Sequence, residues 1–222
     1  MNAESKRPTR ILVVDDHPIV RLGIRRMLEG HPDLEICGEA DSAEAALQIA
    51  SRLKPDLAVV DLSLAQGTAL KLIQALRKSV ANLRVLVLSM HDEALFAERV
   101  LGAGARGYIM KQAAIEGLVN AIREVASGRI YVSENMTQRA LAKLSGSTGR
   151  EEGSIDPLAA LSNRELEVFN LIGHGKSTVA IAAQLEVSVK TIETYRANIR
   201  SKLNLQDAND LVRFATSWAE GL

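Results

Sequence analysis

Five short runs rich in valine, isoleucine and leucine recur in the first 130 residues, and they constrain the fold more than any other feature of the chain. The segments between them carry apolar residues at steps of three and four, as Ile19, Leu22 and Leu28 illustrate, which is typical of amphipathic helices. Short apolar strands that alternate with helices predict βαβ units and a parallel sheet. We therefore expect an α/β domain of five strands and five helices, with the strands near residues 10–14, 34–38, 57–60, 84–88 and 107–109.

The pattern changes after this domain. A further helix is predicted near residues 134–144, and the stretch 145–153 contains no apolar residue, which favours a flexible linker. Beyond it the strand signals stop. We therefore expect three regions, namely a first domain at 1–130, a linker with a helix at 131–156 and an all-α domain at 157–222.

The last region has the signals of four short helices. Ser162 and Glu165 form a capping box at the first helix, and the next three have plausible N-caps in Ser177, Ser188 and Asp207. The middle pair, at about 177–185 and 188–202, is separated by only two or three residues. This spacing is typical of a helix-turn-helix.

Composition excludes several classes of protein. The chain has 222 residues, 47% of them apolar, which is enough to bury a core. Its 27 basic and 27 acidic residues cancel, which argues against a protein that coats nucleic acid by charge alone. No run approaches the roughly 18 apolar residues of a membrane span, and the polar start lacks a signal peptide, so we expect a cytoplasmic protein without a membrane partner. Cys37 is the only cysteine, so it cannot form a disulfide framework or zinc cluster alone, and we expect it to be buried.

Polar residues end four of the five predicted strands. The set is Asp15 with Asp16, Asp61, Ser89 and Lys111. The carboxyl ends of parallel strands share one edge of a sheet, so these side chains can converge there. An aspartate can attack phosphorus and carry the phosphoryl group as an acyl phosphate, provided that a metal and a cation absorb the charge. Any single aspartate can be explained as a turn former, but the set predicts a site for Mg²⁺ and a phosphoryl group.

These residues stand in motifs that resemble the NarL/FixJ-type response regulators, in which a receiver domain precedes a LuxR-type helix-turn-helix. The resemblance covers nearly the whole chain and implies a flavodoxin-like (βα)5 receiver. The motifs are Val-Val-Asp15-Asp16-His-Pro, Val-Val-Asp61-Leu, Leu-Ser89-Met-His-Asp and Gly-Ala-Arg-Gly-Tyr108-Ile-Met-Lys111.

The resemblance implies a role for each residue by its position. Asp61 would be the phosphoacceptor and would receive its phosphoryl group from the histidine of a sensor kinase. Lys111 and Ser89 would contact the phosphoryl oxygens, and Ser89 with Tyr108 would form a switch pair. The ligands of Mg²⁺ would be Asp15, Asp16, Asp61 and the carbonyl of Ser63.

The first domain also departs from the family pattern. Ala65 and Ala69 replace the proline and glycine usual in the loop after Asp61, and Gln112 stands where many receivers have a cis-proline. We expect the changes at Ala65 and Ala69 to affect acyl-phosphate lifetime or kinase docking more than the phosphorylation chemistry, whereas this subgroup often lacks the proline at the position of Gln112.

Five further side chains of the first domain have simple structural explanations. His17 and His91 flank the predicted pocket, and we expect them to be loop or cap residues. Met27, Met90 and Met110 are expected to fill the core.

The helix that begins at Ser188 has the two faces of a DNA reader. Ile192, Ile199 and Leu203 make an apolar stripe, and the opposite face is polar, with more basic than acidic residues. A solvated amphipathic helix is the alternative explanation. The segment resembles the LuxR-type motif, which implies that Glu193, Thr194 and Ala197 face base edges. It also implies phosphate or mixed contacts for Lys190, Thr191 and Arg196.

This domain departs from its family as well. Thr178, Val179 and Ala180 replace the usual Asn-Lys-Glu, which removes a charged patch, and Glu186 occupies a turn where glycine is frequent. We therefore expect modest affinity for double-stranded DNA and binding as a homodimer when phosphorylated.

The sequence thus predicts a response regulator in which phosphorylation of Asp61 controls DNA binding and transcription. One alternative is a stand-alone phosphatase, which the second domain makes less plausible; we expect no enzyme activity beyond phosphorylation and dephosphorylation of Asp61 itself. The other is a phosphorylation-switched interaction module whose helix-turn-helix serves dimerisation.

Overall fold

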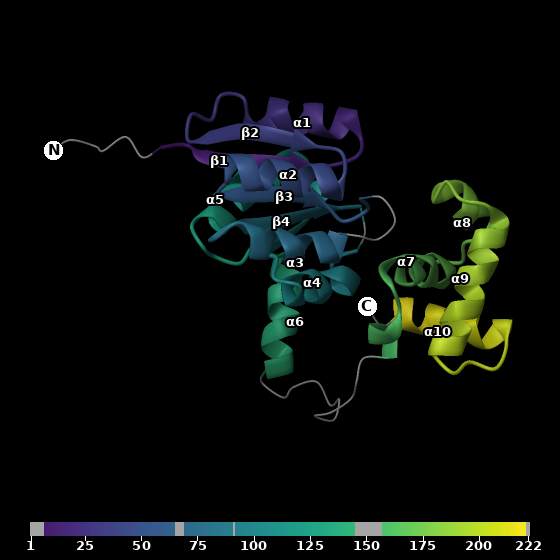
Figure 1. Ribbon diagram of the computed structural model, residues 1–222. Coiled ribbons are helices and arrows are strands. Elements are labelled where there is room, and N and C mark those ends of the chain that lie inside the picture. The colour runs from purple at the N-terminus through teal and green to yellow at the C-terminus, as the bar shows by residue number, and fades with distance from the viewer. Residues whose placement is uncertain (1–6, 65–68, 91, 145–156, 221–222) are drawn as a thin grey trace. The chain divides into compact units, whose positions relative to one another are not determined.

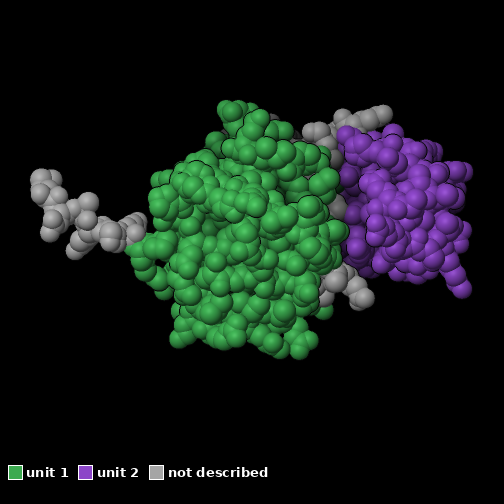
Figure 2. All heavy atoms as spheres, turned by 90° about the horizontal axis from the view of Figure 1, so that it is seen from above, with its two compact units in different colours: residues 1–148 green, residues 149–222 purple. Residues whose placement is uncertain are grey.

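The computed structural model describes residues 7–64, 69–90, 92–144 and 157–220. It forms two compact units, residues 1–148 and 149–222, coloured separately in Figure 2. The division between them falls in 145–156, outside the described residues, as does the predicted linker at 145–153. The three predicted regions therefore remain predictions at their boundaries. Within the described parts, no helix is both long and apolar enough to span a membrane.

The first unit is built on one parallel sheet whose strand order is β2-β1-β3-β4-β5 (Figure 1). This is the flavodoxin-like order, in which the chain changes direction between β1 and β3. The predicted α/β fold with five strands is confirmed. The strands are β1 (Thr9–Val14), β2 (Leu34–Ala40), β3 (Leu57–Asp61), β4 (Arg84–Ser89) and β5 (Gly107–Met110).

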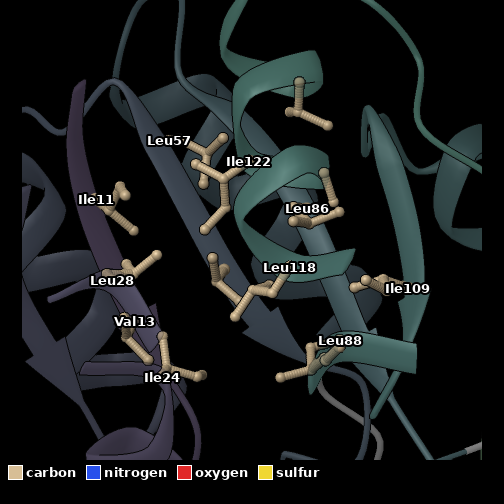
Figure 3. Packing of buried hydrophobic residues seen from close by; sticks show 14 of the residues in the cluster. Ile11, Val13, Ile24, Leu28, Leu57, Leu86, Leu88, Ile109, Leu118 and Ile122 are labelled. Carbon is tan, nitrogen blue, oxygen red and sulfur yellow. The ribbon is translucent and has the colours of Figure 1, made fainter. Parts of the chain in front are cut away.

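Helices cover both faces of this sheet, which is why its central strands β1, β3 and β4 are apolar on both sides. On one face α1 packs with α5 over alternate strand residues such as Val13, Leu57 and Leu86, as Figure 3 shows. On the other face α2, α3 and α4 lie side by side. These helices are α1 (Pro18–Leu28), α2 (Ala43–Leu53), α3 (Ala69–Ser79), α4 (Glu93–Gly102) and α5 (Lys111–Ala126), and α6 (Glu134–Leu144) follows them.

The second unit is all helical, as predicted. Ser162 and Glu165 form the predicted capping box, and the side chains of Ser177 and Ser188 cap the next two helices. Glu186, in the turn between those two, has a left-handed φ of 53°. The unit consists of a short 3-10 helix (Pro157–Ala160), α7 (Asn163–Gly173), α8 (Thr178–Gln184), α9 (Val189–Lys202) and α10 (Ala208–Glu220).

Two expectations about buried residues are wrong. Met90 does not fill the core, because its side chain is 57% exposed at the end of β4, whereas Met27 is half-buried and packs against the core. Cys37 is half-buried rather than buried, and its thiol donates to the carbonyl of Ile11 at 3.4 Å. Burial raises the pKa of this thiol, so it is poorly suited to act as a nucleophile.

Helices α7 and α10 approach closely at Gly173. A β-carbon there would lie 2.6 Å from the carbonyl oxygen of Ala215, which is backbone and cannot move aside cheaply. We expect Gly173→Ala to destabilise the second unit by about 2 kcal/mol, as overpacking commonly does. Denaturation monitored by Trp218 fluorescence measures this. Gly23→Ala in α1 is the control, because nothing lies within 4 Å of its added carbon; it should be neutral or stabilising by up to about 1 kcal/mol. Equal effects would contradict the packing argument.

The carboxylate of Glu165 ties α7 to α9 and should make the second unit sensitive to acid. Burial raises its pKa, but the Lys202 ammonium at 2.6 Å and the Ser162 N–H at 2.7 Å outweigh burial, so the pKa lies below its usual value. The native state then binds fewer protons than the unfolded state, so stability is complete above the unfolded pKa of about 4.5 and falls as pH drops through the lower folded pKa.

Glu165→Gln should therefore lower the free energy of unfolding of the second unit by about 1 to 2 kcal/mol at pH 7. Below pH 5 the variant should lose less stability than the wild-type protein. Urea denaturation between pH 3 and 7 tests both effects. An unchanged pH dependence in the variant would show that other groups govern acid sensitivity.

Candidate phosphoacceptor and DNA-binding sites

The carboxyl edge of the sheet brings two buried carboxylates together. Asp15 directly follows β1 and Asp61 ends β3, and these strands pair in parallel with Val14 opposite Val60. Each aspartate is 1% exposed. Asp16, the next residue, keeps about a third of its side chain in solvent. The site therefore combines two dry carboxylates with one that solvent can reach.

Lys111 supplies the positive charge that these carboxylates need. It is the first residue of α5, directly after β5, and its Nζ lies 2.9 Å from Asp15 Oδ2 and 3.2 Å from Asp61 Oδ2. Burial lowers the pKa of Lys111, but the carboxylates of Asp61 and Asp15 outweigh it, so the pKa is raised. The side chain is thus held as an ammonium ion.

Asp61 retains an oxygen that can react. Its Oδ1 accepts a hydrogen bond from the backbone N–H of Ser63 at 3.2 Å. Its buried Oδ2 faces Lys111 but accepts no well-aligned hydrogen bond within the part of the chain that the structure describes. Burial raises the pKa of Asp61, the Lys111 ammonium opposes that rise, and Asp15 adds to it. An additional cation beside Oδ2 would favour the ionised form.

The acidic residues fit a divalent cation. Asp15, Asp16, His17 and Asp61 each offer one ligand atom, and these atoms lie within 4.8 Å of one another. Carboxylate oxygens are hard ligands that suit Mg²⁺. The carbonyl of Ser63, also expected as a ligand, belongs to the residue whose N–H already binds Asp61. Its role, like those of the other predicted ligands, stays a prediction.

His17 is closer to the site than its expected role as a cap suggested. It occupies the N-cap position of α1, but its ring makes no capping hydrogen bond. Instead Nδ1 lies 2.7 Å from Asp16 Oδ1 and 3.2 Å from Asp15 Oδ1, and its backbone N–H donates to Asp15 Oδ1 at 2.8 Å. Its position directly after Asp15 and Asp16 was the available sequence signal. His91 lies outside the described residues.

The expected switch pair is buried beside this edge. Ser89 ends β4 and is fully buried, and Tyr108 in the neighbouring β5 is 1% exposed. Their side chains are hydrogen-bonded to each other. Burial raises the pKa of Tyr108 strongly, so the phenol stays protonated. A movement of the Ser89 hydroxyl away from this position would therefore break its hydrogen bond with Tyr108.

Helix α9 presents the polar face expected of a DNA reader. Ile192 and Ile199 are buried, and Leu203 at the end of the helix is half-buried. Opposite them lie the exposed side chains of Lys190, Glu193, Thr194 and Ala197, with Thr191 and Arg196 half-buried at the margins.

Two threonines on α9 already have hydrogen-bond partners. Thr194 Oγ1 donates to the Lys190 carbonyl at 3.0 Å, and Thr191 Oγ1 lies 2.8 Å from Ser188 Oγ. Burial and the nearby Arg200 lower the pKa of Arg196, yet this guanidinium remains charged near neutral pH. The face thus offers both fixed hydroxyls and cations.

The departures from the family pattern differ in their surroundings. Ala69 is fully buried at the first turn of α3, while Gln112 is exposed in α5. Ala65 lies outside the described residues. In α8, Val179 is 65% exposed and Ala180 is exposed, so the usual lysine and glutamate at these two positions would lie on the surface.

Comparison with known proteins identifies both halves of the chain. Residues 11–123 match the family described as response regulator receiver domain, and residues 159–215 match the bacterial regulatory proteins of the luxR family. The chain is 36% identical to the oxygen regulatory protein NreC of Staphylococcus carnosus (strain TM300), over 93% of this chain and 96% of that protein. It is 34% identical to the response regulator UvrY of Escherichia coli (strain K12), over 92% of each chain.

A solved structure shares the arrangement of elements. RcsB from Salmonella enterica serovar Typhimurium, bound to the promoter rprA in the presence of the phosphomimetic BeF3−, has a TM-score of 0.58 and 25% identity, over 94% of this chain and 98% of that chain. The chain therefore belongs to the NarL/FixJ family of response regulators, which regulate transcription through a receiver domain and a LuxR-type DNA-binding domain.

Proposed function

We propose that a sensor histidine kinase phosphorylates Asp61 and that this event controls the binding of the second domain to specific double-stranded DNA. The observation that carries the proposal is the buried Asp61 Oδ2, which faces the Lys111 ammonium at 3.2 Å and lacks a well-aligned hydrogen bond within the described residues. A carboxylate in this state is a nucleophile beside a ready counter-charge.

The transfer follows from this arrangement. Asp61 Oδ2 attacks the phosphorus of the kinase phosphohistidine, the P–N bond breaks as the P–O bond forms, and the imidazole keeps the electron pair and takes up a proton. Lys111 then contacts the new phosphoryl oxygens, and the Ser89 hydroxyl donates to one of them. Asp15, Asp16, Asp61 and the Ser63 carbonyl hold Mg²⁺, which offsets part of the phosphoryl charge when it is bound.

The reaction is confined to Asp61 itself. The acyl phosphate forms and hydrolyses at Asp61, with no separate substrate to turn over. The phosphorylated chain acts in the cytoplasm as a homodimer in which two copies of α9 enter successive major grooves. The relative RcsB has been solved as dimers on DNA, which supports this arrangement.

Asp61→Asn should reduce labelling by acetyl phosphate to background, because an amide cannot form the acyl phosphate. Mass spectrometry of the protein in the presence of Mg²⁺ measures the added phosphoryl group, and chelation of Mg²⁺ should also abolish it. Asp41→Asn, which changes an exposed acid shortly after β2, should label normally. Undiminished labelling of Asp61→Asn at another residue would refute the site.

Lys190 and Glu193 should affect DNA binding in different ways. Lys190→Ala removes a proposed phosphate contact, so it should weaken all sequences about equally and lower the slope of log affinity against log salt by about 1. Glu193→Ala removes a proposed base contact and should relax specificity at one base pair, at a cost of about 1 to 3 kcal/mol.

Binding of beryllofluoride-treated protein to sequences selected from a random library, at several salt concentrations, separates the two effects. A wild-type protein that retains no DNA even after treatment would favour the interaction-module function.

A further inference from the structure

The chain returns to the receiver sheet directly after α5. Tyr131 forms a parallel bridge with Gly107 at the edge of β5. Its N–H donates to the Arg106 carbonyl at 3.0 Å, and its carbonyl accepts from the Tyr108 N–H at 2.8 Å. The Tyr131 ring packs against the core. The segment that leads out of the receiver is therefore fastened to the backbone of Tyr108, the proposed switch residue.

A second contact fastens the same segment to α4. Glu93, in the first turn of α4, is only 8% exposed, and its Oε1 accepts a hydrogen bond from the Ser133 N–H at 2.8 Å. Ser133 itself caps α6, because its Oγ accepts from the Met136 N–H at 3.1 Å and its carbonyl accepts from the Thr137 N–H. A carboxylate beside a helix N-terminus stabilises that end of the helix. Glu93 therefore fixes where α6 begins, as the closeness of α4 and α6 in Figure 1 illustrates.

Glu93 also lies within electrostatic reach of the switch pair. Burial raises the pKa of Tyr108, and the Glu93 carboxylate adds to that rise, whereas the hydrogen bond with Ser89 opposes it. Hydrogen bonds thus join Ser89 to Tyr108 and Tyr108 to Tyr131, and two residues further on Ser133 is bonded to Glu93 at the start of α6. A movement of the Ser89 hydroxyl toward a phosphoryl group changes the partner of Tyr108, a residue of β5, and β5 packs against α4.

We propose that Glu93 is a positioning residue that transmits the state of Asp61 to α6, and so to the DNA-binding domain, through its hydrogen bond to Ser133. This inference rests on the proposed function. In one state of the receiver α4 and β5 hold Tyr131 and Ser133 together, and α6 starts where it does here. When α4 shifts relative to β5, the backbone hydrogen bond of Tyr131 to Tyr108 in β5 and the hydrogen bond of Ser133 to Glu93 in α4 cannot both persist. The start of α6 is then released.

Hydrogen exchange tests whether the contact with Glu93 holds the start of α6, and retention of DNA tests whether the state of Asp61 reaches the DNA-binding domain through it. The variants are Glu93→Ala, which removes the acceptor, and Glu93→Gln, which keeps an oxygen that can accept from Ser133. Glu98→Ala is the matched control, because Glu98 is an exposed acid on the same helix. Ser133→Pro removes the donor from the exposed side of the contact, so it tests the path should Glu93→Ala fail to fold. Its reference is Ser133→Ala, which loses the same capping hydroxyl but keeps the N–H. Labelling of Asp61 by acetyl phosphate reports on folding and chemistry in each variant.

We expect amides 134–137 of the full-length protein to exchange about tenfold faster in Glu93→Ala than in the wild type, and faster in Ser133→Pro than in Ser133→Ala, with Asp61 labelling intact. The beryllofluoride-dependent gain in retention of fragments that the wild-type protein enriches from genomic DNA should fall by about tenfold in Glu93→Ala and Ser133→Pro. Glu93→Gln and Glu98→Ala should keep most of that gain.

Faster exchange with an unchanged gain would show that the contact only anchors α6 and would overturn the proposal while leaving phosphorylation at Asp61 standing. Absence of labelling in the wild-type protein would instead refute the proposed function and this inference with it.

Discussion

The contact of the Lys111 ammonium with the buried carboxylates of Asp15 and Asp61 is the interaction on which the rest of the receiver depends. Two carboxylates in a dry environment repel each other, and a single cation between them makes their approach tolerable. Lys111 reaches both because β5 delivers it to the same edge at which β1 and β3 end. The site still carries excess negative charge after this pairing, so it has a place for a divalent cation.

The same excess explains why a phosphoryl group can change the state of the domain. An acyl phosphate replaces one negative charge on Asp61 with about two on the phosphoryl oxygens. Lys111 lies 3.2 Å from Asp61 Oδ2, and the proposed second contact to the phosphoryl group, the Ser89 hydroxyl, is already hydrogen-bonded to Tyr108. Satisfying the new charge therefore requires a different arrangement of a buried pair, and close-packed interiors change by discrete steps rather than continuously.

Features that depend on neighbouring residues were predictable from the sequence. The strands, the capping box of Ser162 and Glu165, and the caps Ser177 and Ser188 follow from local patterns, and the structure contains them. The meeting of Asp15, Asp61 and Lys111 was also predictable, because parallel strands share an edge.

Features set by contacts across the fold were not predictable. The hydrogen bond from Ser133 to Glu93 joins residues 40 positions apart and has no signature in either segment. Met90 was misjudged for a similar reason. Its place at the end of an apolar strand suggested burial, but the strand ends at Ser89 and the side chain points into solvent.

The modest electrostatics of the second domain suit a protein whose DNA binding is controlled. The chain has no net charge, and α8 exposes Val179 and Ala180 where its family usually has charged residues. We therefore expect a single copy to neutralise few phosphates and to bind one half-site with low affinity. In the proposed homodimer the second binding event is intramolecular, which raises occupancy of a full site without any new contact to DNA. A more basic domain would bind DNA whatever the state of Asp61, and phosphorylation would then control little.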